Sequence, residues 1–282
     1  MDYKFGSDIL VLIADLHIHT TYSDGLLTPD EVIKVAFQKG LYAISITDHD
    51  TVAGIRKFEN SQVKVIPGIE FGCVFEGEDV HILGYFSKYF LPKISEKVSF
   101  LKEKRTERCS EIIKKLNNQG LKIDMEDVCI YTQNGLIGRP HIARALIERG
   151  YVHSMREAFD LYLNRGCPAY VERCSLSIEE TIDLIHEEGG IAVLAHPGLI
   201  KRKEIIDYVI KEGIDGLEVI HSKHTHEDVA YFLNLAKKKN LLITGGSDSH
   251  GDLINGEYLI GRYYVPVDNL MKGERRISID QL

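Results

Sequence analysis

Two histidines separated by one residue, His17 and His19, stand directly after the apolar run Ile9–Leu16. Residues i and i+2 of a β-strand project to the same side, so a strand end can aim both imidazoles at one point. Converging imidazole nitrogens are suitable ligands for a divalent metal ion. The pair alone is a weak signal, because short polar patterns recur by chance. Other residues of ligand type also follow apolar runs: Asp24, Asp48, His49, Asp50, Glu70, His81, His196, Asp248 and His250.

The size of this set predicts more than one metal ion. About ten nitrogen and oxygen ligands exceed what one ion binds and suit two or three ions. No cysteine belongs to the set, and imidazole combined with carboxylate favours Mn²⁺, Zn²⁺ or Fe, a choice that the residue types leave open. Asp48 and Asp50 are equally consistent with turn formation or with support of a ligand. Three histidines without a ligand-like neighbour are interpreted as surface residues: His153, His186 and His226.

Alternating apolar and amphipathic segments must position these residues. Thr28 begins a capping box followed by Pro29, which predicts a helix that ends at about Lys39. Further helices are expected from Ser177 to Gly189, over Glu204–Lys211 and over Thr225–Lys239. The predicted strands are Ile9–Leu16, Leu41–Thr47, Val63–Ile66, the hairpin pair Glu70–Val74 and Val80–Phe86, Ile191–Ala195, Gly216–Ile220 and Leu241–Thr244.

This alternation predicts an α/β fold with a mostly parallel sheet, either open or closed into a barrel. Nearly all of the ligand candidates follow the carboxyl end of a predicted strand, and His81 opens the return strand of the hairpin. Because the carboxyl ends of parallel strands meet at one face, we expect the candidates to converge there.

The middle of the chain lacks apolar runs of comparable strength. Its pattern predicts a long charged helix over Pro92–Asn118 and shorter helices over Pro140–Arg149 and Ser154–Asn164. On the long helix, Arg105 and Arg108 fall near the apolar stripe, so they should face inward, where an arginine needs an anionic partner.

We therefore expect two structural units. Residues 9–91 and 172–282 should form a discontinuous barrel domain, and residues 92–171 a helical insertion that covers the active site.

The composition is that of a folded protein with an acidic balance. The chain has 282 residues, 44% of them apolar, and a formal net charge of -8. This charge argues against a protein that holds duplex DNA by neutralising phosphates, yet it allows a nucleotide bound beside metal ions. Ile9–Ala14 is too short to span a membrane. The five cysteines form no CxxC pair, so we expect reduced thiols in a cytoplasmic protein.

Five segments of the chain, in order, resemble the motifs of the polymerase and histidinol phosphatase (PHP) family: Asp15–Gly25, Ile46–Asp50, Pro67–Glu70, Ala195–Pro197 and Gly246–Gly251. The resemblance implies a distorted (β/α)7 barrel with a trinuclear metal site. By position, the first ion would bind His17, His19, Glu70 and Asp248. The second would bind Asp24, His49 and His250, and the third would bind Glu70, His81 and His196.

A narrower branch of the family also resembles this chain. Its members carry a helical insertion with paired arginines, here Arg105 and Arg108, followed by a segment similar to Gly138–His141. The branch implies a phosphatase acting on nucleoside 3′,5′-bisphosphates, or an enzyme trimming short RNA from its 5′ end. Residues expected to bind substrate are Arg105, Arg108, Arg139, His141 and His224. His221, and alternatively His224, would support a ligand or the fold.

The expected mechanism is direct attack of metal-bound hydroxide on phosphorus without a phosphoenzyme, because the chain has no serine nucleophile elbow and no P-loop. Four alternatives stay open. They are a histidinol-phosphate phosphatase, a polymerase-associated proofreading activity, a barrel that binds metal or nucleotide without catalysis, and an amidohydrolase.

Overall fold

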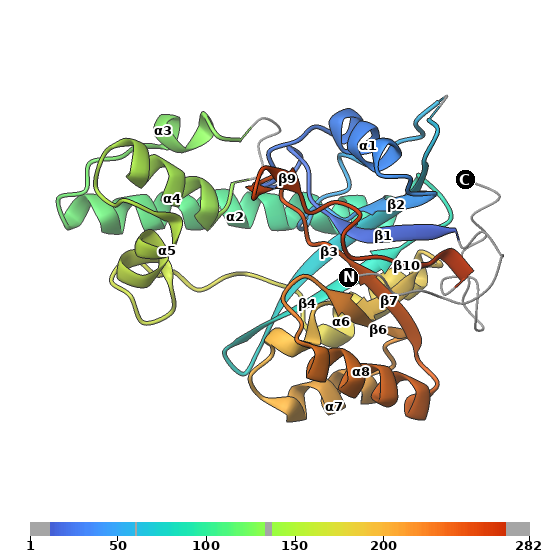
Figure 1. The fold of residues 1–282 in the computed structure, drawn as a ribbon. Coiled ribbons are helices and arrows are strands. Elements are labelled where there is room, and N and C mark those ends of the chain that lie inside the picture. Colours follow the sequence, from blue (N-terminus) through green and yellow to red (C-terminus); the bar gives the residue numbers. More distant parts are fainter. Residues whose placement is uncertain (1–11, 60, 133–136, 269–282) are drawn as a thin grey trace.

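A computed structural model of the chain describes residues 12–59, 61–132 and 137–268. Its centre is an eight-stranded sheet in the order β10-β1-β2-β3-β4-β5-β6-β7 (Figure 1). The strands are β1 Ile13–Ile18, β2 Ala43–Ile46, β3 Lys64–Phe75, β4 Glu78–Tyr85, β5 Ile191–Leu194, β6 Gly216–His221, β7 Leu242–Gly246 and β10 Val265–Pro266. Of the first predicted strand, Ile9–Val11 lie outside the described residues.

The sheet curves into a nearly closed barrel, because the segment after β7 pairs with the end of β1. The backbone N–H of Asp248 donates to the carbonyl of His17 at 2.9 Å, and that of His19 donates to Ser249 at 2.9 Å. The pairs β1–β2, β2–β3, β5–β6 and β6–β7 are parallel, whereas β4 runs antiparallel to both β3 and β5. The predicted distorted (β/α)7 barrel is confirmed.

One prediction within the sheet was wrong. Val63–Ile66 and Glu70–Val74 were expected as separate strands, but β3 runs through both. The strand changes partner at its Pro67–Gly68 step, since Lys64–Pro67 pairs with β2 and Gly68–Phe75 pairs with β4. At this step the backbone of β3 lies close to Ser45 of β2. Glycine permits the contact, because a Cβ at position 68 would lie 2.3 Å from Oγ of Ser45.

Helices cover the barrel at the predicted places. They are α1 Pro29–Gln38, α6 Ile178–Glu187, α7 Lys203–Lys211 and α8 His226–Lys239. The predicted caps are present, since Thr28 and Ser177 each accept a hydrogen bond from the backbone of the residue three positions on. A 3₁₀ turn, η2 Pro197–Leu199, follows β5, and a small hairpin of β8 Leu253–Ile254 and β9 Glu257–Tyr258 follows β7.

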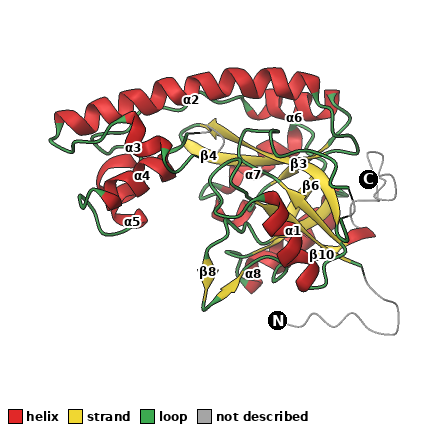
Figure 2. Cartoon of the chain, turned by 90° about the horizontal axis from the view of Figure 1, so that it is seen from above, coloured by secondary structure: helices red, strands yellow, loops and turns green. Residues whose placement is uncertain are grey.

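The middle of the chain is helical and extends away from the barrel (Figure 2). It contains α2 Pro92–Asn118, α4 Arg139–Glu148 and α5 Met155–Ala158, which continues as a π-helical turn, η1 Phe159–Leu163. A further short helix, α3 Met125–Cys129, is capped by Asp124 and was not predicted from the sequence. Long helix α2 joins two hydrophobic cores, because Val98 packs in the barrel core and Leu116 in the core of the helical segment.

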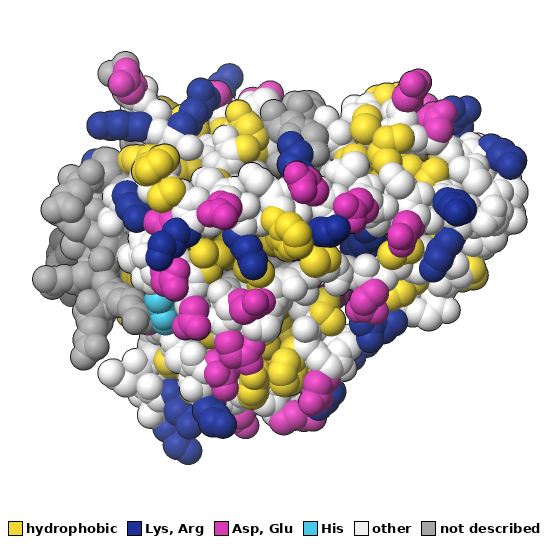
Figure 3. All heavy atoms as spheres, turned by 180° about the vertical axis from the view of Figure 1, so that it is seen from behind, with side chains coloured by type: hydrophobic (Ala, Val, Ile, Leu, Met, Phe, Trp, Pro, Cys, Tyr) yellow, Lys and Arg dark blue, Asp and Glu magenta, His cyan; other side chains and the backbone are white. Residues whose placement is uncertain are grey.

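The molecular surface is of mixed charge. The face opposite to that of Figure 1 shows basic and acidic side chains interspersed with small hydrophobic patches (Figure 3). None of the described helices combines the length and apolarity that crossing a bilayer requires.

Candidate metal centre

Glu70, buried in β3, is the carboxylate on which the first group of predicted ligands converges. Its Oε2 atom lies 3.3 Å from Nε2 of His17, 3.3 Å from Nε2 of His19 and 2.9 Å from Nδ1 of His49. The other oxygen, Oε1, lies 2.8 Å from Nδ1 of His81. The end of β1, the turn after β2 and strand β4 thus deliver imidazoles to both sides of one carboxylate.

The second group lies between β1 and the segment after β7. Nε2 of His250 is 3.4 Å from Oδ1 of Asp24, and the rings of His19 and His250 stack at 4.2 Å. Together with His49, these residues offer four donor atoms within 4.8 Å of one another.

Two further predicted ligands complete the group. Oδ1 of Asp248 is 3.2 Å from Nε2 of His19, and Nε2 of His196 is 3.1 Å from Oε1 of Glu70. Both residues have positive φ, 52° and 29°, a backbone strain that commonly marks functional sites. The structure brings all predicted ligands together, and we call this set the metal-ligand cluster: His17, His19, Asp24, His49, Glu70, His81, His196, Asp248 and His250.

Hydrogen bonds within the cluster leave several of its buried polar atoms without a partner, and divalent cations would satisfy them. Nδ1 of His19, Oδ1 of Asp24 and Oε2 of Glu70 are buried and have no hydrogen-bond partner among the described residues. Nε2 of His17 and Nε2 of His19 lie 3.1 Å apart, so two ring nitrogens also converge on this point. Buried carboxylate oxygens without donors need positive charge, and a set of nitrogen and oxygen ligands suits divalent cations.

The pKa shifts within the cluster also indicate that its carboxylates require positive charge nearby. Burial opposes charge on His17, yet the carboxylates of Glu218, Glu70 and Asp248 raise its pKa well above the usual value. Burial likewise opposes charge on Glu70, but His49 and its other imidazole neighbours hold its pKa well below normal. The carboxylates are therefore ionised and demand counter-charge, which protons or metal ions can supply.

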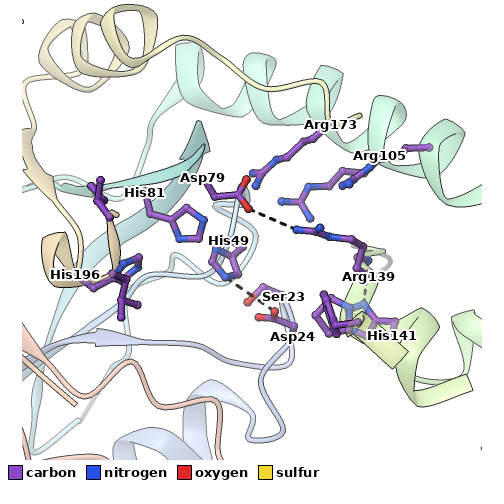
Figure 4. Close-up of a pocket in the computed structure, with 16 residues that line it drawn as sticks. Ser23, Asp24, His49, Asp79, His81, Arg105, Arg139, His141, Arg173 and His196 are labelled. Atoms are coloured by element: carbon purple, nitrogen blue, oxygen red, sulfur yellow. Dashed lines mark hydrogen bonds and ion pairs between the residues drawn. The ribbon is translucent and has the colours of Figure 1, made fainter. Parts of the chain in front are cut away.

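A cavity of about 330 Å³ opens beside the metal-ligand cluster (Figure 4). One side carries Asp24, His49, His81 and His196 from the barrel. The opposite side carries four arginines, which we call the arginine wall: Arg105, Arg108, Arg139 and Arg173. The cavity therefore places a cation-seeking cluster opposite a group of cations.

The arginine wall is only partly neutralised. Arg105 and Arg173 both donate to the buried Asp50, while Arg108 donates to the carbonyl of Val171 at 2.9 Å. Arg139 lies 3.8 Å from Oδ2 of Asp79. Burial, followed by repulsion from the neighbouring arginines, lowers the pKa of Arg108 to about 10. The buried Nε atoms of Arg105 and Arg173 have no hydrogen-bond partner among the described residues, so the wall is suited to an anion.

The two histidines expected to bind substrate differ in placement. His141 lines the cavity, accepts a hydrogen bond from the backbone N–H of Gly138 at 3.0 Å, and has a pKa lowered to about 4, chiefly by burial. His224 does not line it. Its Nδ1 bonds the carbonyl of Val219 at 2.9 Å and its Nε2 accepts from the backbone of Gly198 at 3.1 Å. This arrangement favours the alternative prediction that His224 supports the fold, and its role in substrate binding stays a prediction.

The ambiguous aspartates beside His49 have supporting roles. Asp48 accepts hydrogen bonds from the backbone and hydroxyl of Thr20 at 2.7 and 2.6 Å and from the Ser23 hydroxyl at 2.6 Å. It therefore shapes the loop that carries Asp24. Asp50, as described above, joins the barrel to the arginine wall.

Two residues at the site were given no role from the sequence. Arg173 lies in an irregular segment whose sequence has no periodicity, so no local signal marked it. Glu218 lies in β6, with Oε1 3.0 Å from Nδ1 of His17. A glutamate within an otherwise apolar strand is a usable signal, because burying an isolated carboxylate is costly.

Comparison with known proteins identifies relatives over most of the chain. Residues 15–245 match the PHP domain. The chain is 33% identical to the 5′-3′ exoribonuclease Rnm of Escherichia coli, over 85% of each chain. It is 32% identical to the 3′,5′-nucleoside bisphosphate phosphatase of Chromobacterium violaceum, over 84% of this chain and 86% of that protein.

A solved structure shows the same fold. A Bifidobacterium adolescentis protein, assigned as a metal-dependent phosphoesterase, superimposes with a TM-score of 0.81 at 31% identity. The alignment covers 91% of this chain and 93% of that one.

Proposed function

The chain belongs to the PHP domain family of metal-dependent phosphoesterases, and from this premise we propose that it hydrolyses a phosphate ester of a nucleotide. The substrate would be a nucleoside 3′,5′-bisphosphate, a short 5′-phosphorylated RNA, or both. One observation carries the proposal: the metal-ligand cluster and the arginine wall face each other across one cavity. A substrate with a scissile phosphate at the cluster and a second phosphate at the wall satisfies both sides.

Two or three divalent ions would be held by the metal-ligand cluster, with Mn²⁺, Zn²⁺ and Fe as candidates. His17, His19, Glu70 and Asp248 would hold the first ion. The second would bind Asp24, His49 and His250, and the third Glu70, His81 and His196. The unpartnered oxygens of Asp24 and Glu70 support this assignment. When bound, such ions lower the pKa of water and neutralise phosphate oxygens.

The arginines would bind and orient the second phosphate. Arg105 is already paired with Asp50, so Arg108 and Arg139 have the least compensated charge for an incoming anion. A guanidinium offers paired N–H donors that match phosphate oxygens. His141, neutral at pH 7 because of its lowered pKa, would contribute a hydrogen bond rather than a charge.

The helical segment would act as the cover of the site. We propose residues 92–171 as an insertion into a barrel formed by residues 9–91 and 172–282. Ion pairs between the two parts, from Arg105 to Asp50 and from Arg139 to Asp79, support this division. The proposed compartment is the cytoplasm, consistent with five free cysteines, and duplex DNA is not a proposed substrate.

A substrate panel tests the proposal. Purified protein loaded with Mn²⁺ would be given adenosine 3′,5′-bisphosphate, a short 5′-phosphorylated RNA and histidinol phosphate, with released phosphate or nucleotide measured. We expect turnover of the first or second substrate, loss of turnover after chelation, and its return with Mn²⁺. Undiminished hydrolysis by metal-stripped protein would contradict the metal-dependent mechanism. Preference for histidinol phosphate would contradict the assigned substrate.

A further inference from the structure

Glu218 is a fully buried carboxylate that lies behind the metal-ligand cluster, in the centre of β6. Its Oε1 atom is 3.0 Å from Nδ1 of His17, and its Oε2 atom accepts a hydrogen bond from the backbone N–H of His196 at 2.8 Å. Both oxygens thus lie within hydrogen-bond distance of a nitrogen from a predicted metal ligand. In this respect Glu218 differs from Glu70, whose Oε2 has no hydrogen-bond partner among the described residues.

We infer that Glu218 is a positioning residue that fixes the tautomer of His17 and thereby makes the metal-ligand cluster competent to bind its first cation. The inference rests on the proposed function, because it concerns the ions that this function requires. A neutral imidazole carries one N–H and one lone pair, and only the lone pair can bind a metal. An ionised carboxylate can only accept, so Glu218 makes Nδ1 of His17 the donor and leaves the lone pair on Nε2.

The nitrogen left free is the one that faces the cluster. Nε2 of His17 lies 3.3 Å from Oε2 of Glu70, 3.5 Å from Oδ1 of Asp248 and 3.1 Å from Nε2 of His19. His250 shows the same arrangement with a backbone acceptor. Its Nδ1 is 3.1 Å from the carbonyl of Asp248, and its Nε2 faces Asp24. Acceptors behind the rings thus hold both lone pairs toward the cluster.

The substitution Glu218→Gln separates this role from simple packing. A glutamine side chain has the same shape but one acceptor and one NH₂ group. The backbone N–H of His196 is a fixed donor, so the amide oxygen must face it. The NH₂ group then faces Nδ1 of His17, which can accept only if its proton moves to Nε2. Oε2 also lies 3.3 Å from Nδ1 of His17, so keeping the original tautomer would require one amide oxygen to accept from both nitrogens. Glu218→Gln therefore favours the tautomer with the proton on Nε2, the nitrogen that faces the cluster.

The test is the affinity of the full-length protein for Zn²⁺, measured by competition with a chromophoric chelator. Circular dichroism would verify that each variant is folded. We expect Glu218→Gln to weaken Zn²⁺ binding about 10- to 100-fold. The loss should be at least as large as that of Glu218→Ala, which removes the acceptor without adding a donor. A purely structural role predicts the reverse order, because glutamine preserves the shape that alanine loses.

Glu188→Gln is the matched control. Glu188 is also buried, and it accepts from the backbone of Lys93 at 2.6 Å and from Nζ of Lys88 at 2.7 Å, but it does not line the cavity. This variant should bind Zn²⁺ with wild-type affinity. A smaller loss in Glu218→Gln than in Glu218→Ala, or wild-type affinity in both, would overturn the inference.

Neutron diffraction from the zinc-loaded wild-type protein gives an answer that does not depend on any variant folding. The inference expects deuterium on Nδ1 of His17, and deuterium on Nε2 alone would overturn it. Failure of the wild-type protein to bind Zn²⁺ at all, or to hydrolyse any phosphate ester, would instead contradict the proposed function from which the inference starts.

Discussion

The two sides of the cavity have opposite electrostatic demands. On the barrel side, the buried atoms without partners include the acceptors Oδ1 of Asp24 and Oε2 of Glu70, which need cations. On the side of the arginine wall, which we call the insertion side although Arg173 itself follows the insertion, they are the donors Nε of Arg105 and Nε of Arg173, which need an anion. Neither side can satisfy the other directly across an open cavity. A phosphate ester bound together with metal ions, as proposed above, would satisfy both sets.

The two sides of the cavity would also have different roles, one in the reaction and the other in substrate selectivity. The metal-ligand cluster contains the groups that would hold ions and activate water, and these act on any phosphate ester. The arginine wall would contact the part of the substrate that does not react, so it would decide which ester is bound. Substitutions on the barrel side should therefore affect turnover, whereas substitutions on the insertion side should affect binding of one substrate class.

Glu70→Ala should produce the largest effect. It removes the carboxylate shared by the two sides of the metal-ligand cluster, so bound metal should fall and kcat for adenosine 3′,5′-bisphosphate should drop about 10³-fold, or ~4 kcal/mol of barrier. Metal analysis and steady-state kinetics test this expectation. Glu96→Gln, at an exposed site on α2, is the control. Retention of both metal and turnover in Glu70→Ala would contradict the assignment of metal binding to the barrel side of the cavity.

Asp50→Asn should destabilise the fold by about 3 kcal/mol, because two mostly buried guanidinium groups lose their carboxylate. Added phosphate should raise the Tm of this variant more than that of the wild type, since an anion can replace Asp50. Thermal and urea unfolding measure both effects. Asp30→Asn, which breaks an exposed pair with Arg56, should change the free energy of unfolding by less than about 1 kcal/mol. Equal losses in the two variants would contradict a buried, anion-seeking arginine wall.

Arg139→Ala should raise KM for adenosine 3′,5′-bisphosphate about 10- to 100-fold, the value of one charged hydrogen-bonding partner. The KM for p-nitrophenyl phosphate, which has no second phosphate, should change little. Arg156→Ala is matched in residue type and in location within the helical segment, but its side chain is 91% exposed, so it should alter neither KM. If Arg139→Ala raises both KM values equally, the arginine is not reading the second phosphate.

His224→Ala should have the smallest effect, because His224 does not line the cavity. Its ring bonds two backbone groups, so its loss should cost about 1 kcal/mol of stability while leaving KM within about twofold. Thermal unfolding and bisphosphate kinetics measure the two quantities. A rise in KM as large as that of Arg139→Ala would restore the predicted role in substrate binding.

The same division explains what the sequence could predict. Most ligands of the metal-ligand cluster follow an apolar run, so one local rule, that strand ends converge, anticipated how His17, Glu70 and Asp248 would meet. The α/β class with a mostly parallel sheet followed from the same alternation, whereas the closed barrel was implied by the family resemblance. The single long strand β3 was not anticipated, because Pro67 and Gly68 resemble a break when partner strands are unknown.

The insertion side was less predictable, because its contacts are long-range and irregular. The inward positions of Arg105 and Arg108 followed from helical periodicity. Arg173 meets Asp50 across 123 residues and lies outside any regular element, so no local pattern could pair them. The short helix α3 also escaped prediction, since five residues are too few to show a helical period.

Anomalous diffraction from crystals grown with Mn²⁺ or Zn²⁺ tests the central claim most directly. The account predicts two or three peaks inside the metal-ligand cluster, with Glu70 contacting more than one of them. Crystals of metal-loaded, active protein that show no peak there, or that place the ions away from these side chains, would contradict it.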